Sequence, residues 1–176
     1  MLNQKSFNDL VMQILTSICN QFEEYFMILG DPEIVLVEHN NWDPNIPMQV
    51  SEDGNQIDIN LQGFYGLLEK EAKRRKIWKL DEYVKFVRFQ TAMILGHELR
   101  HVAQIKYVEK RIPNKKERDA FFEYIFEKYK DSGDEAPWEQ DAYRCEYEGD
   151  IYNVDTAFKD IDKVYESDIK EWRSLK

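Results

Sequence analysis

The amino-acid sequence predicts an α+β fold with an N-terminal helix, a small mixed or antiparallel sheet, and helices over the remainder. Apolar residues recur at helical spacing over residues 5–29. Short β-branched or alternating segments follow within residues 33–61. From Phe64 onward, helical periodicity returns and is broken mainly at proline and glycine. This order of elements is typical of a two-layer α+β domain.

The length and composition suit one compact domain. The chain has 176 residues, of which 43% are hydrophobic, with 4 Trp, 10 Tyr and 10 Phe. That supply of apolar side chains is sufficient for a core, so we expect a folded chain. We expect a single domain over residues 1–176, with the first helix, the sheet and a basic helix in residues 1–80 and a helical part in residues 81–176.

The first half is expected to contain the sheet. The first helix ends at the sequence Gly30-Asp31-Pro32, and the run IVLV that follows is typical of a buried strand. Residues 46–51 and 56–61 are expected to pair antiparallel around an Asp53-Gly54 turn. Polar residues alternate with isoleucines in the second of these strands, so we expect it at an edge or half exposed.

The chain from residue 64 onward is expected to be helical. Asp81 is the expected N-cap of its longest helix. The expected helices cover residues 64–77, 81–107, 115–130, 138–148 and 155–172.

Charge and cysteine content argue against several classes of function. A net charge of −10 and a pI of about 4.9 are unfavourable for binding nucleic acid or an anionic membrane surface. We interpret the one basic run, residues 70–76, as a solvated helix face. Cys19 and Cys145 form no disulfide framework. With neither a signal-peptide pattern nor a membrane span, we expect a soluble, cytoplasmic protein.

The sequence HELRH, residues 97–101, indicates a metal site. His97 and His101 lie four residues apart, so on a helix both imidazoles share one face and can bind one ion. Glu98 is rotated by about 100° from His97, beside the ion, where its carboxylate can hold a water. The H-E-x-x-H pattern is typical of zinc hydrolases. The alternative is a pair of surface histidines that bind neighbouring carboxylates.

A catalytic zinc site usually has three protein ligands. The chain has three histidines, and the third, His39, is expected in a loop or at a strand end. We therefore expect the third ligand to be a carboxylate on a later helix.

Two motifs together resemble the compact gluzincin-type H-E-x-x-H zinc metallopeptidases. HELRHVAQ, residues 97–104, is followed by PWEQDAY, residues 137–143, and the similarity covers about residues 82–150. The resemblance implies a zincin-like fold, with an edge strand beside the active-site helix. It also implies Glu139 as the third zinc ligand and Ala142 as a close-packing residue.

Other carboxylates compete for the role of third ligand. Glu146, which precedes Asp150 by four residues, is the main alternative to Glu139. Glu135 and Asp141 are also near in sequence, although Asp141 should point away from the face that carries Glu139.

The expected function is zinc-dependent hydrolysis of a peptide or protein substrate, with Glu98 as general base. Tyr143, four residues after Glu139, is the candidate that stabilises the oxyanion, and its alternative role is packing. Residues 56–61 are a candidate for binding the peptide by strand addition. Two other functions remain open: a zincin-fold binding or regulatory module with little turnover, and a metal-free helical interaction protein.

Overall fold

The computed structural model describes residues 2–21, 27, 29–37, 43, 45–148 and 160–176. They form a mostly helical α+β arrangement with a small sheet. The elements are α1 (Gln4–Gln21), β1 (Glu33–Leu36), β2 (Met48–Val50), β3 (Gln56–Ile59), α3 (Leu61–Arg74), α4 (Leu80–Arg111), α5 (Lys115–Lys128), the 3-10 turn η2 (Gly133–Glu135), α6 (Pro137–Glu148) and α8 (Ile161–Ser174).

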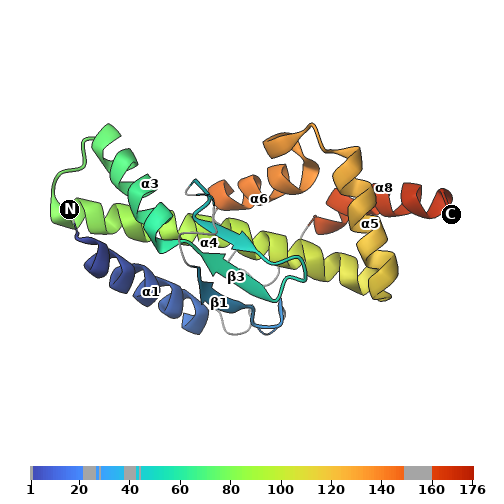
Figure 1. Ribbon diagram of the computed structural model, residues 1–176, viewed down its shortest axis with the longest axis horizontal. Helices are drawn as coiled ribbons and strands as arrows, with labels where there is room; N and C mark the ends of the chain where they lie inside the picture. The colour runs from blue at the N-terminus through green and yellow to red at the C-terminus, as the bar shows by residue number, and fades with distance from the viewer. Residues whose placement is uncertain (1, 22–26, 28, 38–42, 44, 149–159) are drawn as a thin grey trace.

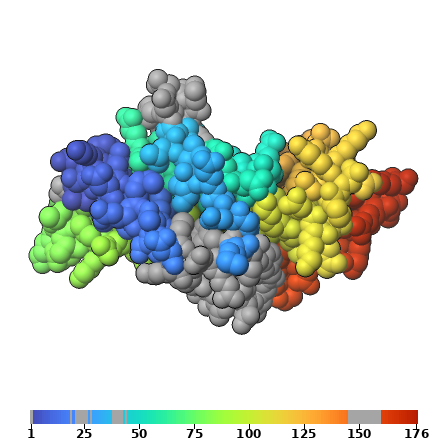
Figure 2. Space-filling view, turned by 90° about the horizontal axis from the view of Figure 1, so that it is seen from below, coloured from blue at the N-terminus to red at the C-terminus, as the bar shows by residue number. Residues whose placement is uncertain are grey.

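Helix α4 runs along the long axis of the molecule and contacts most other elements (Figure 1). It has 32 residues, and its length is therefore about 48 Å. Figure 1 shows α1, α3 and the sheet beside one part of it, and α5 and α8 beside its C-terminal end. In the space-filling view, α1 in dark blue and α8 in red lie toward opposite ends (Figure 2).

The apolar core is divided in the same way. One cluster joins α1, the sheet and α3 to α4, with fully buried side chains such as Phe7, Leu15 and Leu99. A second cluster joins the end of α4 to α5 and α8 around Phe121 and Trp172. Among the described helices, none is long and apolar enough to cross a membrane.

The sheet corrects two expectations from the sequence. β1 is not the buried strand expected from the IVLV run, because its side chains are half-buried or exposed, with Leu36 53% exposed. The antiparallel pairing of β2 with β3 is confirmed, with Met48 opposite Ile59. However, the strand order is β1-β3-β2, so β3 is the central strand and not an edge, and the half-exposed alternative applies because Gln56 and Asp58 are half-buried. The reason is that β1 pairs parallel with the other side of β3, and Ile57 and Ile59 become fully buried. The exposed edge nearest α4 belongs to β2.

Several helix boundaries also differ from expectation. The expected N-cap of the long helix, Asp81, is wrong, because α4 begins at Leu80 after Lys79, and no side chain caps it. Asp81 instead lies in the first turn, where its charge favours the helix dipole. Helix α3 starts earlier than expected because the Asn60 side chain accepts a hydrogen bond from the Gly63 amide at 2.8 Å. Asp155, the expected start of the last helix, lies outside the described residues.

The β2–β3 hairpin is attached to α4 at its tip. Gly54, in the expected turn, has φ of +69°, and a Cβ there would lie 3.1 Å from Ile105 Cγ2. Next to it, Lys106 Nζ donates to Asn55 Oδ1 at 2.6 Å. Asp53 Oδ1 accepts from Ser51 Oγ at 2.7 Å and from the Asn55 amide at 3.0 Å. These contacts hold β2 beside the middle of α4.

Candidate metal centre

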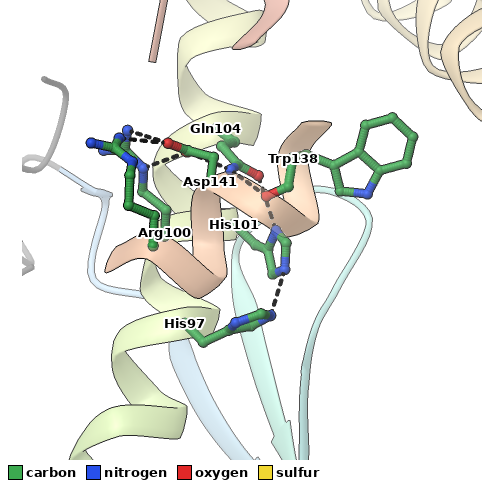
Figure 3. A network of polar contacts seen from close by, with 7 residues as sticks. His97, Arg100, His101, Gln104, Trp138 and Asp141 are labelled. Atoms are coloured by element: carbon green, nitrogen blue, oxygen red, sulfur yellow. Dashed lines mark hydrogen bonds and ion pairs between the residues drawn. The ribbon is translucent and has the colours of Figure 1, made fainter. Parts of the chain in front are cut away.

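Helix α4 brings the two histidines of the HELRH sequence together. The Nε2 atoms of His97 and His101 lie 3.0 Å apart, and their ring centroids are 4.7 Å apart (Figure 3). Both side chains are mostly buried, with 12% and 16% of their surface exposed. The spacing of four residues on a helix produces this convergence directly.

Helix α6 adds a carboxylate to the pair. Glu139 Oε2 lies 3.4 Å from His97 Nε2 and 3.5 Å from His101 Nε2. Within the described part of the chain, this is the single group of three such side chains that could hold a metal ion. A tetrahedral ion with bonds of about 2.0–2.1 Å has its ligand atoms about 3.3–3.4 Å apart. The three donor atoms are therefore spaced as three vertices of such a tetrahedron.

Of the other candidate ligands, those that the structure describes do not join this group. His39, Asp150 and the side chain of Glu146 lie outside the described residues. Glu135 is exposed in η2 and is not part of the group. Asp141 is buried and bonds to Arg100 instead.

A hydrogen-bond network orients the His101 ring (Figure 3). The Gln104 amide nitrogen donates to the Trp138 carbonyl at 3.0 Å and to Asp141 Oδ2 at 2.8 Å. Gln104 Oε1 must therefore accept, and His101 Nδ1, 2.9 Å away, donates to it. This assigns the proton to Nδ1 and leaves the Nε2 lone pair directed at His97 and Glu139. Metal-binding histidines are commonly held in this way.

A buried ion pair holds α6 against α4. Asp141 accepts from Arg100 Nε at 2.7 Å and Arg100 Nη2 at 3.1 Å, and from Arg144 at 2.8 Å. Arg100 is fully buried. Burial alone would raise the pKa of Asp141, but its bonds to Arg100 and Arg144 outweigh that effect and lower it. Because Asp141 is two residues from Glu139, this pair also positions the carboxylate of Glu139.

Glu98 lies next to the three-residue group in a different environment. It is 8% exposed, and burial raises the pKa of its carboxyl to about 7, although the two histidines and the Val50 amide act in the opposite direction. Burial also raises the pKa of Glu139, but its contacts with His101 and His97 lower it well below the usual range. Neighbouring carboxyls with oppositely shifted pKa values commonly have different roles. Here the raised pKa suits Glu98 to proton transfer, and the lowered pKa keeps Glu139 charged, as a metal ligand must be.

The free edge of β2 supplies the amide that faces Glu98. The Pro47 carbonyl and the Ser51 amide bond to β3. Because pairing alternates along an antiparallel strand, the backbone groups of Met48 and Val50 point to the other side. The Val50 amide lies on this side, and it acts to lower the pKa of Glu98.

These residues line a cleft of about 1030 Å³. Its lining includes residues 45–53, which contain β2, and side chains of α5 and α6. Tyr143 lines it as well, with its ring centroid 4.7 Å from that of His97 and an interplanar angle of 61°. The ring of Trp138 packs on Phe126 and Tyr129, at 5.6 and 5.5 Å.

Comparisons of the chain with models of known protein families, with curated protein sequences and with solved structures gave no match. The class of the site is therefore defined by its own geometry. It is a group of two histidines and one carboxylate, beside a buried glutamate and at the base of a cleft.

Sequence reasoning missed Arg100 and Gln104, and it named Asp141 as a nearby carboxylate without its pairing with Arg100. Arg100 occupies a variable position of H-E-x-x-H, where the motif requires nothing of it. The available signal was the presence of Arg100 and Gln104 on a helix with mostly apolar neighbours, since such polar side chains need partners when buried.

Proposed function

We propose that this chain is a zinc-dependent metallopeptidase with a zincin-like fold. The observation that carries the proposal is the triangle of 3.0, 3.4 and 3.5 Å formed by His97 Nε2, His101 Nε2 and Glu139 Oε2, with Glu98 beside it. Two imidazoles and one carboxylate are a ligand set typical of catalytic zinc.

The donor chemistry fits a zinc ion better than a hard cation. Calcium and magnesium prefer six or more oxygen ligands, whereas the group supplies two nitrogens and one oxygen. His97, His101 and Glu139 would hold the ion. When bound, zinc would supply a Lewis acid for the peptide carbonyl and would lower the pKa of a water toward about 7.

Glu98 is the proposed general base. It accepts a proton from the attacking water and passes it to the amine that leaves, so the proton is conserved. A carboxyl with a pKa of about 7 suits both steps near neutral pH, because it can hold and release a proton.

The peptide is proposed to lie along β2. The sequence made residues 56–61 the candidate for binding the peptide by strand addition. We now assign this role to residues 48–50, because β3 pairs with a described strand on both sides, whereas β2 pairs on one side and lines the cleft. Strand addition would use the outward backbone groups of β2 that Glu98 does not occupy. We keep Tyr143 as the proposed oxyanion-stabilising residue, since it lines the same cleft next to His97.

The test begins with the zinc content of untagged protein, for wild type and for His97→Ala, Glu139→Ala and Glu135→Ala. We expect one zinc per chain in wild type and in Glu135→Ala, whose side chain is exposed and outside the group. Zinc should be lost in His97→Ala and Glu139→Ala. Retention of zinc in Glu139→Ala would make another residue the third ligand.

Activity is then tested on a peptide mixture with Glu98→Gln. This variant should keep its zinc and lose hydrolysis by at least about a hundredfold, the usual contribution of a general base. Equal cleavage by wild type and Glu98→Gln would contradict the peptidase mechanism. Zinc binding with no cleavage by either protein would favour a binding or regulatory module.

A further inference from the structure

Three aromatic side chains line the cleft next to the metal centre. We call Phe122, Phe126 and Trp138 the aromatic wall. Phe122 and Phe126 stack with ring centroids 6.1 Å apart, and Phe126 meets Trp138 edge to face at 5.6 Å. The three rings therefore form a continuous apolar surface.

The aromatic wall lies between the second apolar cluster and the cleft: Phe122 and Trp138 are half-buried against that cluster, and Phe126 is the exposed ring. On α5, Phe121 and Ile125 are buried at 0% and 1% exposure and provide the core face of the helix. Phe126 is 55% exposed. A large apolar side chain left this accessible inside a cleft is typical of a binding surface.

The position of the wall is set by the same contacts that order the metal centre. Trp138 directly precedes Glu139, and its carbonyl accepts the hydrogen bond from Gln104 that also orients His101. Residues of β2 line the same cleft. Side chains of an extended peptide on β2 would alternate in direction, so those of one set would point across the cleft toward α5.

We infer that the aromatic wall is a specificity subsite that binds a bulky apolar side chain of the peptide, near the scissile bond. This inference rests on the proposed function for its ligand, a peptide. Charged side chains of both signs line the cleft too, Lys115 and Arg118 as well as Asp119 and Glu123, so the selectivity of this subsite comes from its apolar rings. The preferred substrates are therefore polypeptides with an aromatic or large aliphatic residue at this position.

The test uses ligands that bind without being cleaved. The N-acetylated hydroxamates of phenylalanine, leucine, glycine and aspartate each carry the same metal-binding group and differ in the side chain. Their affinities for the zinc-loaded protein are measured by calorimetry. Burial of about half of an aromatic side chain should make the phenylalanine compound bind roughly tenfold more tightly than the glycine compound. The aspartate compound should bind no more tightly than the glycine compound, because the rings of Phe122 and Phe126 offer its carboxylate no hydrogen-bond donor.

The variants are Phe126→Ala, Phe126→Leu and the double variant Phe122→Ala with Phe126→Ala. Phe89→Ala is the matched control, because Phe89 is 59% exposed on α4 and lies outside the cleft lining. The preference for phenylalanine should be reduced in Phe126→Ala, lost in the double variant, and retained in Phe126→Leu and Phe89→Ala. Circular dichroism and zinc content verify that each variant is folded and loaded.

The outcomes distinguish failure of the proposed subsite from failure of the proposed peptidase activity. Equal binding of all four hydroxamates, or a preference that survives the double variant, overturns the subsite and leaves the metallopeptidase proposal intact. No binding of any hydroxamate to zinc-loaded protein also overturns the subsite. A wall-dependent preference in a protein without Glu98-dependent cleavage supports the subsite and contradicts the peptidase proposal alone.

Discussion

Helix α4 is held on two sides by interfaces of opposite chemistry. Toward α1 and the sheet, it packs through fully buried apolar side chains, with Leu95, Leu99 and Val102 among them. Toward α6, buried polar groups dominate, with Arg100, Gln104 and Asp141 in one network. Apolar contacts are non-directional, whereas a bidentate ion pair is satisfied in one relative position. The polar interface is the one that carries Glu139, where small displacements would matter most.

The difference has a physical consequence for variants. A cavity on the apolar side lowers the free energy of unfolding but leaves the ligand atoms where they are. Loss of one member of the polar network lowers the free energy of unfolding, and α6 is then no longer held in one position relative to α4. Measuring stability and zinc affinity together therefore distinguishes the two interfaces.

The largest effect is expected for Asp141→Asn. The change leaves the buried guanidinium of Arg100 without its counter-charge, which should cost about 3–5 kcal/mol of unfolding free energy. Zinc affinity of the folded protein should fall by at least about tenfold, because Glu139 and Gln104 lose their support. Urea unfolding and competition with a chelator measure the two quantities.

Leu15→Ala is the matched change on the apolar side. Its fully buried side chain predicts a similar cost, about 2–5 kcal/mol, with no change in zinc affinity of the folded protein. Replacing the pair by apolar residues, Arg100→Met with Asp141→Leu, should restore much of the stability but not the zinc affinity. Equal zinc affinities in Leu15→Ala and Asp141→Asn would contradict the contrast between the interfaces.

A smaller loss of stability, with a similar loss of zinc affinity, is expected for Gln104→Leu. The leucine cannot accept the proton on His101 Nδ1, so the imidazole loses its fixed tautomer and orientation. Zinc affinity should fall by about 10–100-fold. The matched control is Gln49→Leu, at an exposed position of β2. If Gln104→Leu binds zinc as tightly as wild type, the network does not support the ligand.

How far the sequence predicts these features depends on the distance along the chain between the partners. His97, Glu98 and His101 lie within one and a half helical turns, so helix geometry alone places them. The structure brings Glu139 to the histidines, but its selection depended on a resemblance, since its 38-residue separation from His101 passes through α5. The Arg100–Asp141 pair spans 41 positions and depends on how two helices pack.

The sheet illustrates the same limit. Pairing of β2 with β3 follows from a local turn, which the Asp53-Gly54 sequence predicts. The parallel pairing of β1 with β3 is not local, and the polar residues of β3 resemble those of an exposed edge. Gln56 and Asp58 are instead half-buried and bond to each other, Nε2 to Oδ1 at 2.5 Å. The alternation of polar and apolar residues along a strand indicates which face of the strand is polar. It does not indicate whether the strand lies at an edge of the sheet.

The smallest effect is expected at the hairpin tip, a polar contact on the sheet side of α4. Hydrogen bonds from Ser51 and Asn55 lower the pKa of Asp53 to about 2. A carboxyl with a depressed pKa stabilises the folded state above its unfolded pKa, and this contribution is lost as pH falls through the folded pKa. Wild type should thus be slightly more heat-stable than Asp53→Asn at pH 6, and the difference should shrink between about pH 4 and pH 2. Thermal unfolding across this range, with Asp43→Asn as a control, tests the prediction. A difference that grows on acidification would mean that the charge of Asp53 does not stabilise the turn.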